Sequence, residues 1–374
     1  MKFKRMDTAE NHSIIKGWLW LAVTSGCLVL LSWIIIHWDL DRAIAGRFYT
    51  PSDGWFLGNR QPWQWLYRYG TIPGIVLAFT SLIAWGVCLV KPRCRSLHRY
   101  FLVIVLSAVI GPGILVNGIL KTYWGRPRPR QVVEFGGQWA YRHLTEPGTP
   151  GKGESFSCGH CSMGFLFCAL VVFRRRRPWV AVAGGATGVI LGGMLGAARV
   201  VQGAHFVSDV LWSFGIVLMV VIINYFFILQ IPKTRKVRSA PMSPMKRWLT
   251  LGLLSISALA MTYAFLMHRP FYKEHQALLN IPSNLEIIAL NSNAETEKLH
   301  IEYRDDRMPQ ILLVARGFGW TNAEHRLHGT IQYENRRINA ALAIETHGYF
   351  AELSHELTVI LPKRMKNRTR VELL

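Results

Sequence analysis

Seven apolar runs, most of them close to 20 residues long, are the feature that most limits how this chain can fold. A membrane-spanning helix needs about 20 predominantly apolar residues, so we expect each run to cross a bilayer. The shortest run can still cross if its helix begins near His160 and flanking residues cover the difference in length. The sequence therefore predicts a mainly α-helical, polytopic membrane protein. The runs lie at roughly 17–37, 72–90, 100–120, 161–173, 179–198, 208–230 and 249–267.

The basic residues lie between these runs. The chain of 374 residues is 51% hydrophobic, yet its formal net charge is +21. Such an excess can indicate a nucleic-acid partner, but basic residues in short loops beside apolar runs are instead the pattern that orients membrane proteins. We therefore expect a membrane partner and no nucleic acid. The clusters are Lys2, Lys4 and Arg5; Lys91, Arg93, Arg95 and Arg99; Arg174 to Arg177; and Lys233, Arg235, Lys236, Arg238, Lys246 and Arg247.

The positions of the clusters also predict a topology. If residues 1–15 form a cytoplasmic tail, the basic loops after the second, fourth and sixth runs are cytoplasmic too, as the positive-inside rule requires. Residues 16–230 then form a six-span membrane domain, 231–248 a basic cytoplasmic linker and 249–267 a seventh transmembrane helix. The loops after the first, third and fifth runs face the periplasm of a bacterial inner membrane.

Residues 271–374 have a different character. Short alternating or β-branched runs are separated by turn residues, which is typical of a small β-rich soluble domain. Loop parity places this domain in the periplasm. Its histidines lack the spacing of metal ligands, so we expect no metal there. The runs are Leu299–Tyr303, Ile311–Ala315, Thr330–Tyr333, Ile338–Ile344 and Leu357–Leu361.

Three short polar segments lie at the ends of apolar runs, all in the predicted periplasmic loops. They are Lys121–Pro129, Ser157–His160 and Arg199–Asp209. Charged side chains at a membrane boundary are costly unless something anionic compensates them. Because the three segments face the same side of the bilayer, they can meet there and form an active site.

The cations of these segments suit a phosphate group. Lys121, Arg128 and Arg199, brought together, form a cationic pocket in which the arginines are planar bidentate donors for phosphate oxygens. The backbone N–H groups of Gly159 and His160, at the start of the fourth helix, add an anion site. The three segments therefore predict a phosphate-binding pocket.

Two histidines and an aspartate supply the groups that hydrolysis needs. His205 and Asp209 are four residues apart, so on a helix they share a face, and the carboxylate can orient the imidazole. His205 is then a credible nucleophile at phosphorus, and His160 can act as general acid and then general base. This predicts hydrolysis through a phosphohistidine without a metal or cofactor. A transporter's ion pathway is the competing interpretation, but it gives no reason to gather so many cations at one boundary.

The three segments together resemble a known family. Their Lys-x6-Arg-Pro, Gly-His and Arg-x5-His-x3-Asp patterns are similar to those of the type-2 phosphatidic acid phosphatase superfamily, over roughly residues 70–230. The resemblance implies a six-helix membrane core with an extracytoplasmic active site. It also implies that His205 is the nucleophile, Asp209 its partner and His160 the acid, and that the phosphate ligands are Lys121, Arg128 and Arg199.

The second segment departs from the family pattern. The family usually has Pro-Ser-Gly-His, whereas this chain has Ser157-Cys158-Gly159-His160. A thiol is a weaker donor than a hydroxyl, so we expect Cys158 to act mainly through its backbone. Cys158 and Cys161 also form a Cys-x-x-Cys pattern, for which a disulfide is chemically allowed outside the cytoplasm. A thioredoxin-like catalytic site would need a βαβ surround, which is not expected here.

The expected substrate is a membrane lipid phosphate. Lipid A, undecaprenyl diphosphate, phosphatidylglycerol phosphate and phosphatidic acid are all candidates, and lipid A is favoured because the glycine-rich loop between Lys121 and Ser157 can accommodate a large saccharide headgroup. Phosphotransfer from a lipid diphosphate to another lipid is an alternative. The loop after the first run is aromatic, which is typical of an interfacial belt or of a lipid entrance; it contains Trp55, Phe56, Trp63, Trp65, Tyr67 and Tyr69.

Overall fold

The computed structural model divides into two compact units, Met1–Ala258 and Leu259–Leu374, and each is described by itself. Most of the basic linker and all but one residue of the predicted seventh helix lie outside the described residues. The described residues are 2–149, 153–233, 245, 248, 252, 269–278, 287–292, 296–305, 308–319, 324–334, 337–347, 352–366 and 370–373.

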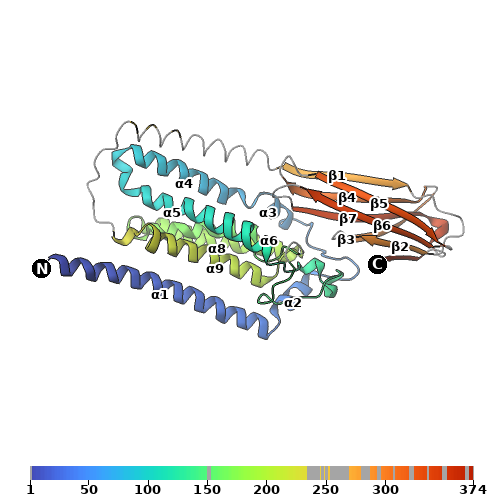
Figure 1. Cartoon of the computed structure of the whole chain (residues 1–374), viewed down its shortest axis with the longest axis horizontal. Helices are drawn as coiled ribbons and strands as arrows, with labels where there is room; N and C mark the ends of the chain where they lie inside the picture. The colour runs from blue at the N-terminus through green and yellow to red at the C-terminus, as the bar shows by residue number, and fades with distance from the viewer. Residues whose placement is uncertain are drawn as a thin grey trace. The chain divides into compact units, whose positions relative to one another are not determined.

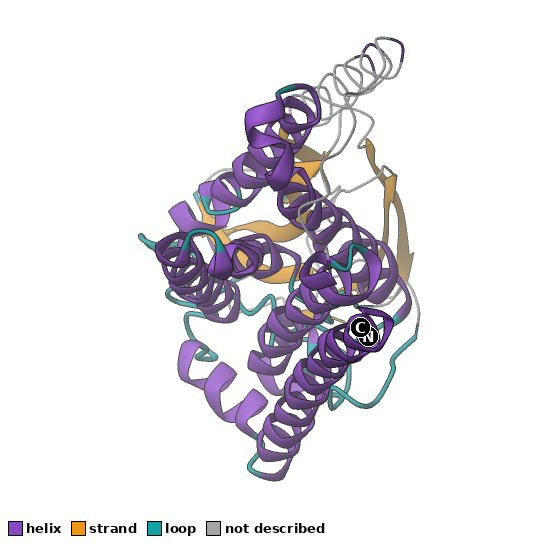
Figure 2. Cartoon of the chain, turned by 90° about the vertical axis from the view of Figure 1, so that its left-hand side faces the viewer, coloured by secondary structure: helices purple, strands orange, loops and turns teal. Residues whose placement is uncertain are grey.

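The first unit is built from long helices (Figures 1 and 2). Within the described part of the chain, five helical stretches are long and apolar enough to cross a membrane, which confirms the polytopic membrane class: His12–His37, Trp63–Val90, Pro92–Tyr123, Pro178–Val201 and Val207–Ile228. The elements of this unit are α1 (Lys2–His37), α2 (Leu40–Ala45), η1 (Gly46–Phe48), α3 (Trp63–Tyr69), α4 (Ile72–Val90), η2 (Pro92–Leu97), α5 (His98–Ala108), η3 (Val109–Leu120), α6 (Lys121–Tyr123), η4 (Pro129–Gln131), η5 (Val133–Phe135), α7 (Gly159–Phe165), η6 (Leu166–Arg175), α8 (Pro178–Val201), α9 (Val207–Ile223), η7 (Asn224–Ile228) and η8 (Ile231–Lys233).

The short fourth run forms a helix in two parts. The seven residues of α7 are α-helical, and the ten residues of η6 continue as a 3₁₀-helix. A 3₁₀-helix rises about 2.0 Å per residue instead of about 1.5 Å, so the two parts together reach about 30 Å, the thickness of a bilayer's hydrocarbon core. The tighter winding therefore gives the short run enough length to cross.

The third span widens near the candidate site. Residues Val109–Leu120 form a π-helix that contains Pro112. Proline has no amide hydrogen, and the Asn117 side chain donates to the Pro112 carbonyl at 2.7 Å. A Cβ atom on Gly159 would lie 2.4 Å from Asn117 Oδ1. The widened turn thus places Asn117 directly against the first residue of α7, where any larger residue would have to displace the Asn117 amide.

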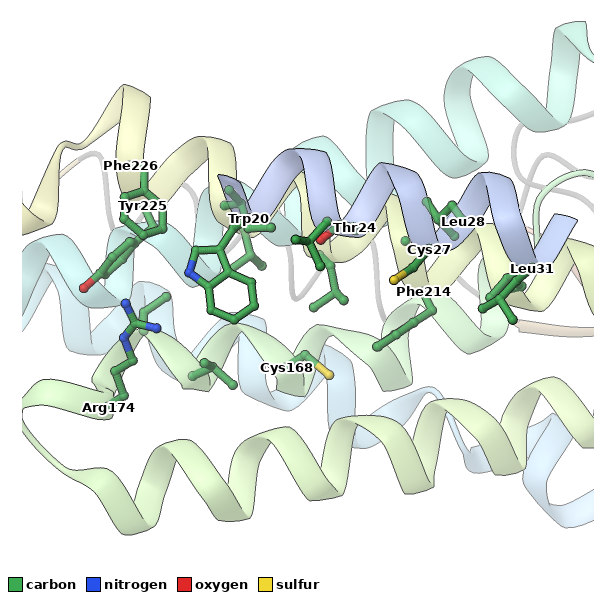
Figure 3. Close-up of a pocket in the computed structure, with 18 residues that line it drawn as sticks. Trp20, Thr24, Cys27, Leu28, Leu31, Cys168, Arg174, Phe214, Tyr225 and Phe226 are labelled. Carbon is green, nitrogen blue, oxygen red and sulfur yellow. The ribbon is translucent and has the colours of Figure 1, made fainter. Parts of the chain in front are cut away.

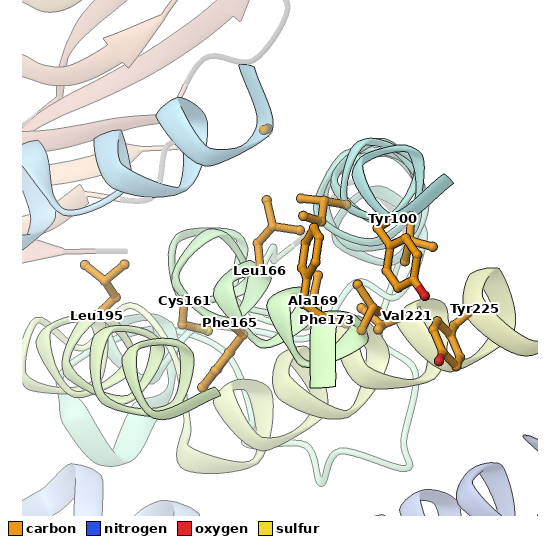
Figure 4. Packing of buried hydrophobic residues seen from close by; sticks show 14 of the residues in the cluster. Tyr100, Cys161, Phe165, Leu166, Ala169, Phe173, Leu195, Val221 and Tyr225 are labelled. Atoms are coloured by element: carbon orange, nitrogen blue, oxygen red, sulfur yellow. The ribbon is translucent and has the colours of Figure 1, made fainter. Parts of the chain in front are cut away.

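Buried apolar side chains join the helices of this unit. Figure 4 shows part of the cluster, in which Tyr100 of α5, Phe165 of α7, Phe173 of η6 and Val221 of α9 come together. Glycines let α7 and α8 approach closely, because a Cβ on Gly164 would lie 2.6 Å from the backbone nitrogen of Gly192. Close contact between small residues is a usual means of helix association in lipid.

The described residues of the second unit form two four-stranded sheets, of order β1-β4-β7-β3 and β5-β6-β2-β8. This confirms the expected β-rich region, and all five predicted runs lie in strands. Antiparallel pairs join β1 to β4, β4 to β7 and β5 to β6, whereas β3–β7, β2–β6 and β2–β8 are parallel. The strands are β1 (Arg269–Leu278), β2 (Ile287–Ser292), β3 (Thr296–Arg304), β4 (Gln310–Gly319), β5 (Glu324–Glu334), β6 (Arg337–His347), β7 (Glu352–Pro362) and β8 (Arg370–Leu373), with the turn η9 (Lys363–Met365).

The glycine contact between α7 and α8 can be tested with a matched pair. Gly164→Ala should destabilise the protein by about 1–3 kcal/mol, because the added methyl group meets backbone atoms that cannot move aside. Gly193→Ala should cause no loss, because a Cβ there would have no atom within 4 Å. Thermal unfolding in detergent, followed by tryptophan fluorescence, measures both. Equal melting temperatures would contradict the close approach.

Candidate active site

His205 lies in the short loop between α8 and α9 and is 1% exposed. Its Nδ1 is 2.6 Å from the backbone carbonyl oxygen of Ser155 and 3.7 Å from Asp209 Oδ2. A carbonyl only accepts hydrogen bonds, so Nδ1 must carry the proton and the lone pair is on Nε2. The imidazole is therefore oriented by a backbone carbonyl, whereas the sequence predicted that Asp209 would accept this hydrogen bond.

Asp209 instead organises the groups around His205. Its Oδ2 accepts hydrogen bonds from Ser155 Oγ at 2.6 Å and from the Phe206 backbone N–H at 2.8 Å. Its Oδ1 accepts from Arg126 Nη1 at 2.6 Å. Asp209 thus fixes both the loop that carries His205 and the segment that supplies the Ser155 carbonyl.

Arg126 is the centre of a buried network of charged groups. Its side chain is fully buried, and it donates to Asp209, to Ser208 Oγ at 2.7 Å and to Asp41 Oδ2 at 2.8 Å. Burial acts to lower the pKa of the guanidinium, but Asp209 and Asp41 raise it above its ordinary value. Arg126 therefore remains a cation between two carboxylates.

Asp41 lies in α2, the short helix that follows the first span, and also belongs to this network. The carboxylate accepts hydrogen bonds from the Ser208 backbone N–H at 2.9 Å and from Ser208 Oγ at 2.6 Å. Ser208 lies in the first turn of α9, where backbone N–H groups lack partners within the helix. Asp41 therefore caps α9 while it neutralises Arg126.

Lys121 and Arg128, the predicted phosphate ligands of the first segment, converge on a single carboxylate oxygen. Glu154 Oε2 lies 3.6 Å from Lys121 Nζ and 3.0 Å from Arg128 Nη2. The Arg128 side chain is only 4% exposed, whereas that of Glu154 is 47% exposed. The two cations thus form one anion-binding position at the mouth of the site.

The second and third polar segments meet on an aromatic ring. Tyr67 of α3 stacks on His160, with ring centroids 5.1 Å apart. The Arg199 guanidinium lies over the same ring, 4.5 Å from its centroid, and its Nη1 donates to Gln202 at 2.9 Å. Tyr67 therefore lies against both His160 and Arg199, a contact worth about 0.5–2 kcal/mol for the cation.

Cys158 uses its side chain within the protein. Its sulfur accepts a hydrogen bond from the Cys161 backbone N–H at 3.5 Å, which caps the start of α7. The Cys161 thiol donates to the Cys158 carbonyl oxygen at 3.2 Å, and both cysteines are free thiols.

Burial acts to lower the pKa of the His205 imidazole, but the nearby Cys158 sulfur and Asp209 raise it above its ordinary value. These two groups stabilise positive charge on His205.

Several functional residues were not predicted from the sequence. The motif spacing points to the residues that would face a substrate, but it does not identify the buried groups that position them. The one available signal was Arg126, a charged residue of the first segment to which the motif assigns no role. The unpredicted residues are Asp41, Tyr67, Arg126, Glu154, Ser155 and Ser208.

The chain is similar to several known proteins. A family model described as the PAP2 superfamily matches residues 97–235. A lipid A 4'-phosphatase of Francisella tularensis subsp. novicida is 30% identical over 194 residues, which cover 50% of this chain and 85% of the relative. Proteins of the same name from Rhizobium leguminosarum and Rhizobium etli are 40% and 38% identical, over 28% and 38% of this chain and 44% and 55% of their own lengths. No solved structure matches the chain.

The helical fold, the matched region and these relatives define a membrane-embedded phosphatase. The chain belongs to the PAP2 superfamily. Asp41 and both β-sheets lie outside the residues that the family model matches.

The buried network can be tested by comparing two aspartates of the same loop. Asp41→Asn should destabilise the protein by about 3–5 kcal/mol, because it removes a charge from a buried ion pair. Asp39→Asn should cost less than about 1 kcal/mol, because the Asp39 side chain is 39% exposed and its ion pair with Arg42 lies at the surface. Thermal unfolding in detergent measures both variants. Similar losses for the two would contradict a special role for the Asp41–Arg126 pair.

Proposed function

We propose that this chain hydrolyses a lipid phosphate at the periplasmic face of a bacterial inner membrane, through a phosphohistidine at His205. The observation that carries the proposal is the hydrogen bond between His205 Nδ1 and the Ser155 carbonyl. It leaves the lone pair on Nε2, the atom that a nucleophilic histidine needs. The orientation of the chain in the membrane is supported by the basic residues Arg174–Arg177. They lie at the end of the span that α7 begins and η6 continues.

The reaction proceeds in two steps. In the first, His205 Nε2 attacks phosphorus, the bond to the lipid oxygen breaks, and His160 gives its proton to that oxygen. In the second, His160 takes a proton from water, the water oxygen attacks phosphorus, and inorganic phosphate leaves His205. Lys121, Arg128 and Arg199 stabilise the negative charge on the transferring phosphoryl group in both steps.

Glu154 supports this use of the cations. Its carboxylate oxygen already lies between Lys121 and Arg128, at hydrogen-bond and ion-pair distances. A phosphate oxygen presents the same kind of charge to the same donors. Substrate binding therefore requires the phosphate to displace the Glu154 side chain, whose exposure allows it to move toward solvent.

The proposed substrate is lipid A, dephosphorylated at its 4'-position. The three matched relatives all carry the name lipid A 4'-phosphatase. The loop between Trp124 and Cys158 contains paired Gly and Pro residues, and it carries both Arg128 and Glu154 of the candidate phosphate site. Its length suits a saccharide headgroup better than a compact glycerol one.

The proposed function is tested by phosphate release from detergent-solubilised protein. We expect release from lipid A and little from undecaprenyl diphosphate or phosphatidylglycerol phosphate. His205→Ala should lower turnover by at least about 10³-fold and should leave the melting temperature nearly unchanged. Turnover retained by this variant would disprove the nucleophile assignment. A phosphorylated lipid product that appears without free phosphate would instead indicate phosphotransfer.

Removal of the Glu154 charge should favour substrate binding. Glu154→Gln should lower the KM for the lipid by about two- to fivefold, because the phosphate no longer competes with a carboxylate for two cations. The kcat should change little. Glu146→Gln, which removes a charge from the same loop at an exposed position, is the matched control. A KM that rises in Glu154→Gln would show that Glu154 assists the substrate rather than competing with it.

A further inference from the structure

A cavity of about 360 Å³ lies in the helical unit between α1, η6 and α9 (Figure 3). Its wall is almost wholly apolar and includes Trp20 and Leu31 of α1 and Phe214 of α9. It contains none of the candidate active-site residues. The proposed reaction therefore does not account for this cavity.

One end of the cavity is polar. Arg174, the first of four consecutive arginines, lines that end together with Tyr225. Figure 3 shows the guanidinium and the phenol hydroxyl at the same end. Tyr225 is 4% exposed, and its hydroxyl has no hydrogen-bond partner among the described residues. A buried hydroxyl without a partner is costly, so this end is suited to a ligand that accepts hydrogen bonds.

The dimensions of the cavity match one leaflet of a bilayer. Its wall extends along α1 from Trp20 to Leu31, which is about 16 Å at the rise of an α-helix. The hydrocarbon core of a bilayer is about 30 Å thick. The apolar part therefore has the length of a single acyl chain, and the polar part lies where a headgroup would be.

This position is far from the candidate active site. Asp209 is in the first turn of α9, whereas Tyr225 follows the end of the same helix. Sixteen helical rises separate them, about 24 Å. A ligand at Arg174 and Tyr225 therefore belongs to the other leaflet.

We propose that the cavity binds one acyl chain of an anionic phospholipid whose phosphate contacts Arg174 and the Tyr225 hydroxyl. An acyl chain fills apolar space that water would not occupy favourably, and it restores the packing contacts that an empty cavity loses. Four arginines in a row favour a lipid with net negative charge over a zwitterionic one. The bound lipid would also fill the space between α1 and α9.

The test is native mass spectrometry of the purified protein, delipidated in detergent and titrated with phosphatidylglycerol or with phosphatidylcholine of identical acyl chains. We expect one phosphatidylglycerol to bind at least about tenfold more tightly than phosphatidylcholine. Arg174→Gln should remove that preference. Arg176→Gln removes the same charge, but Arg176 does not line the cavity. This variant should therefore keep the preference for phosphatidylglycerol.

A second pair of variants tests the cavity itself. Cys27→Trp places a large ring inside the cavity and should abolish binding of the tightly held lipid. Val29→Trp places the same ring on the exposed side of α1 and should leave binding unchanged. Equal binding of the two lipids to the unmodified protein, or a lipid retained by Cys27→Trp, would overturn the proposal. If the mass spectrum of the unmodified protein showed a dimer and that of Cys27→Trp did not, the cavity would instead be assigned to a second copy of the chain.

Discussion

A single buried guanidinium holds the candidate active site together. Arg126 is fully buried and is shared by Asp41 of α2 and Asp209 of α9. A charge in such a place is stable only when its partners have good geometry. The network therefore fixes three segments that are distant in sequence, and it fixes the loop of His205 with them. The alignment of the candidate catalytic groups depends on this interaction more than on any contact that these groups make with one another.

The sequence predicted the residues with motif spacing but not the groups that hold them. Lys121 and Arg128 are found at one carboxylate, and His160 and Arg199 at one tyrosine ring. Their spacing follows a sequence motif, so it can be recognised from the sequence alone. The partners of Arg126 are 85 and 83 residues away from it. No local pattern identifies such a pair, because any carboxylate near a span end would satisfy the same rule.

The fold was predictable wherever one physical signal dominated. Long apolar runs gave the spans, and alternating runs gave five of the strands. The winding of η6 could not be predicted, because 3₁₀ and α geometries use the same apolar residues and differ only in rise. Strand β1 was missed because Arg269–Leu278 mixes polar and apolar residues without alternation, and β2 and β8 because they are short. These strands depend on their neighbours in the sheet.

The hydrogen bond that orients His205 explains why Asp209 has so many other partners. A carboxylate bonded directly to Nδ1 would set the tautomer by itself, and the rest of the loop could vary. Here a backbone carbonyl sets the tautomer, and a carbonyl stays in place only if its residue is anchored. Asp209 therefore acts on Ser155 Oγ, which positions the Ser155 carbonyl, and on the Phe206 N–H, which positions the loop. At 3.7 Å it still attracts the charge that His205 acquires when it is phosphorylated. One carboxylate thereby controls both the orientation and the charge of the histidine without a direct hydrogen bond to it.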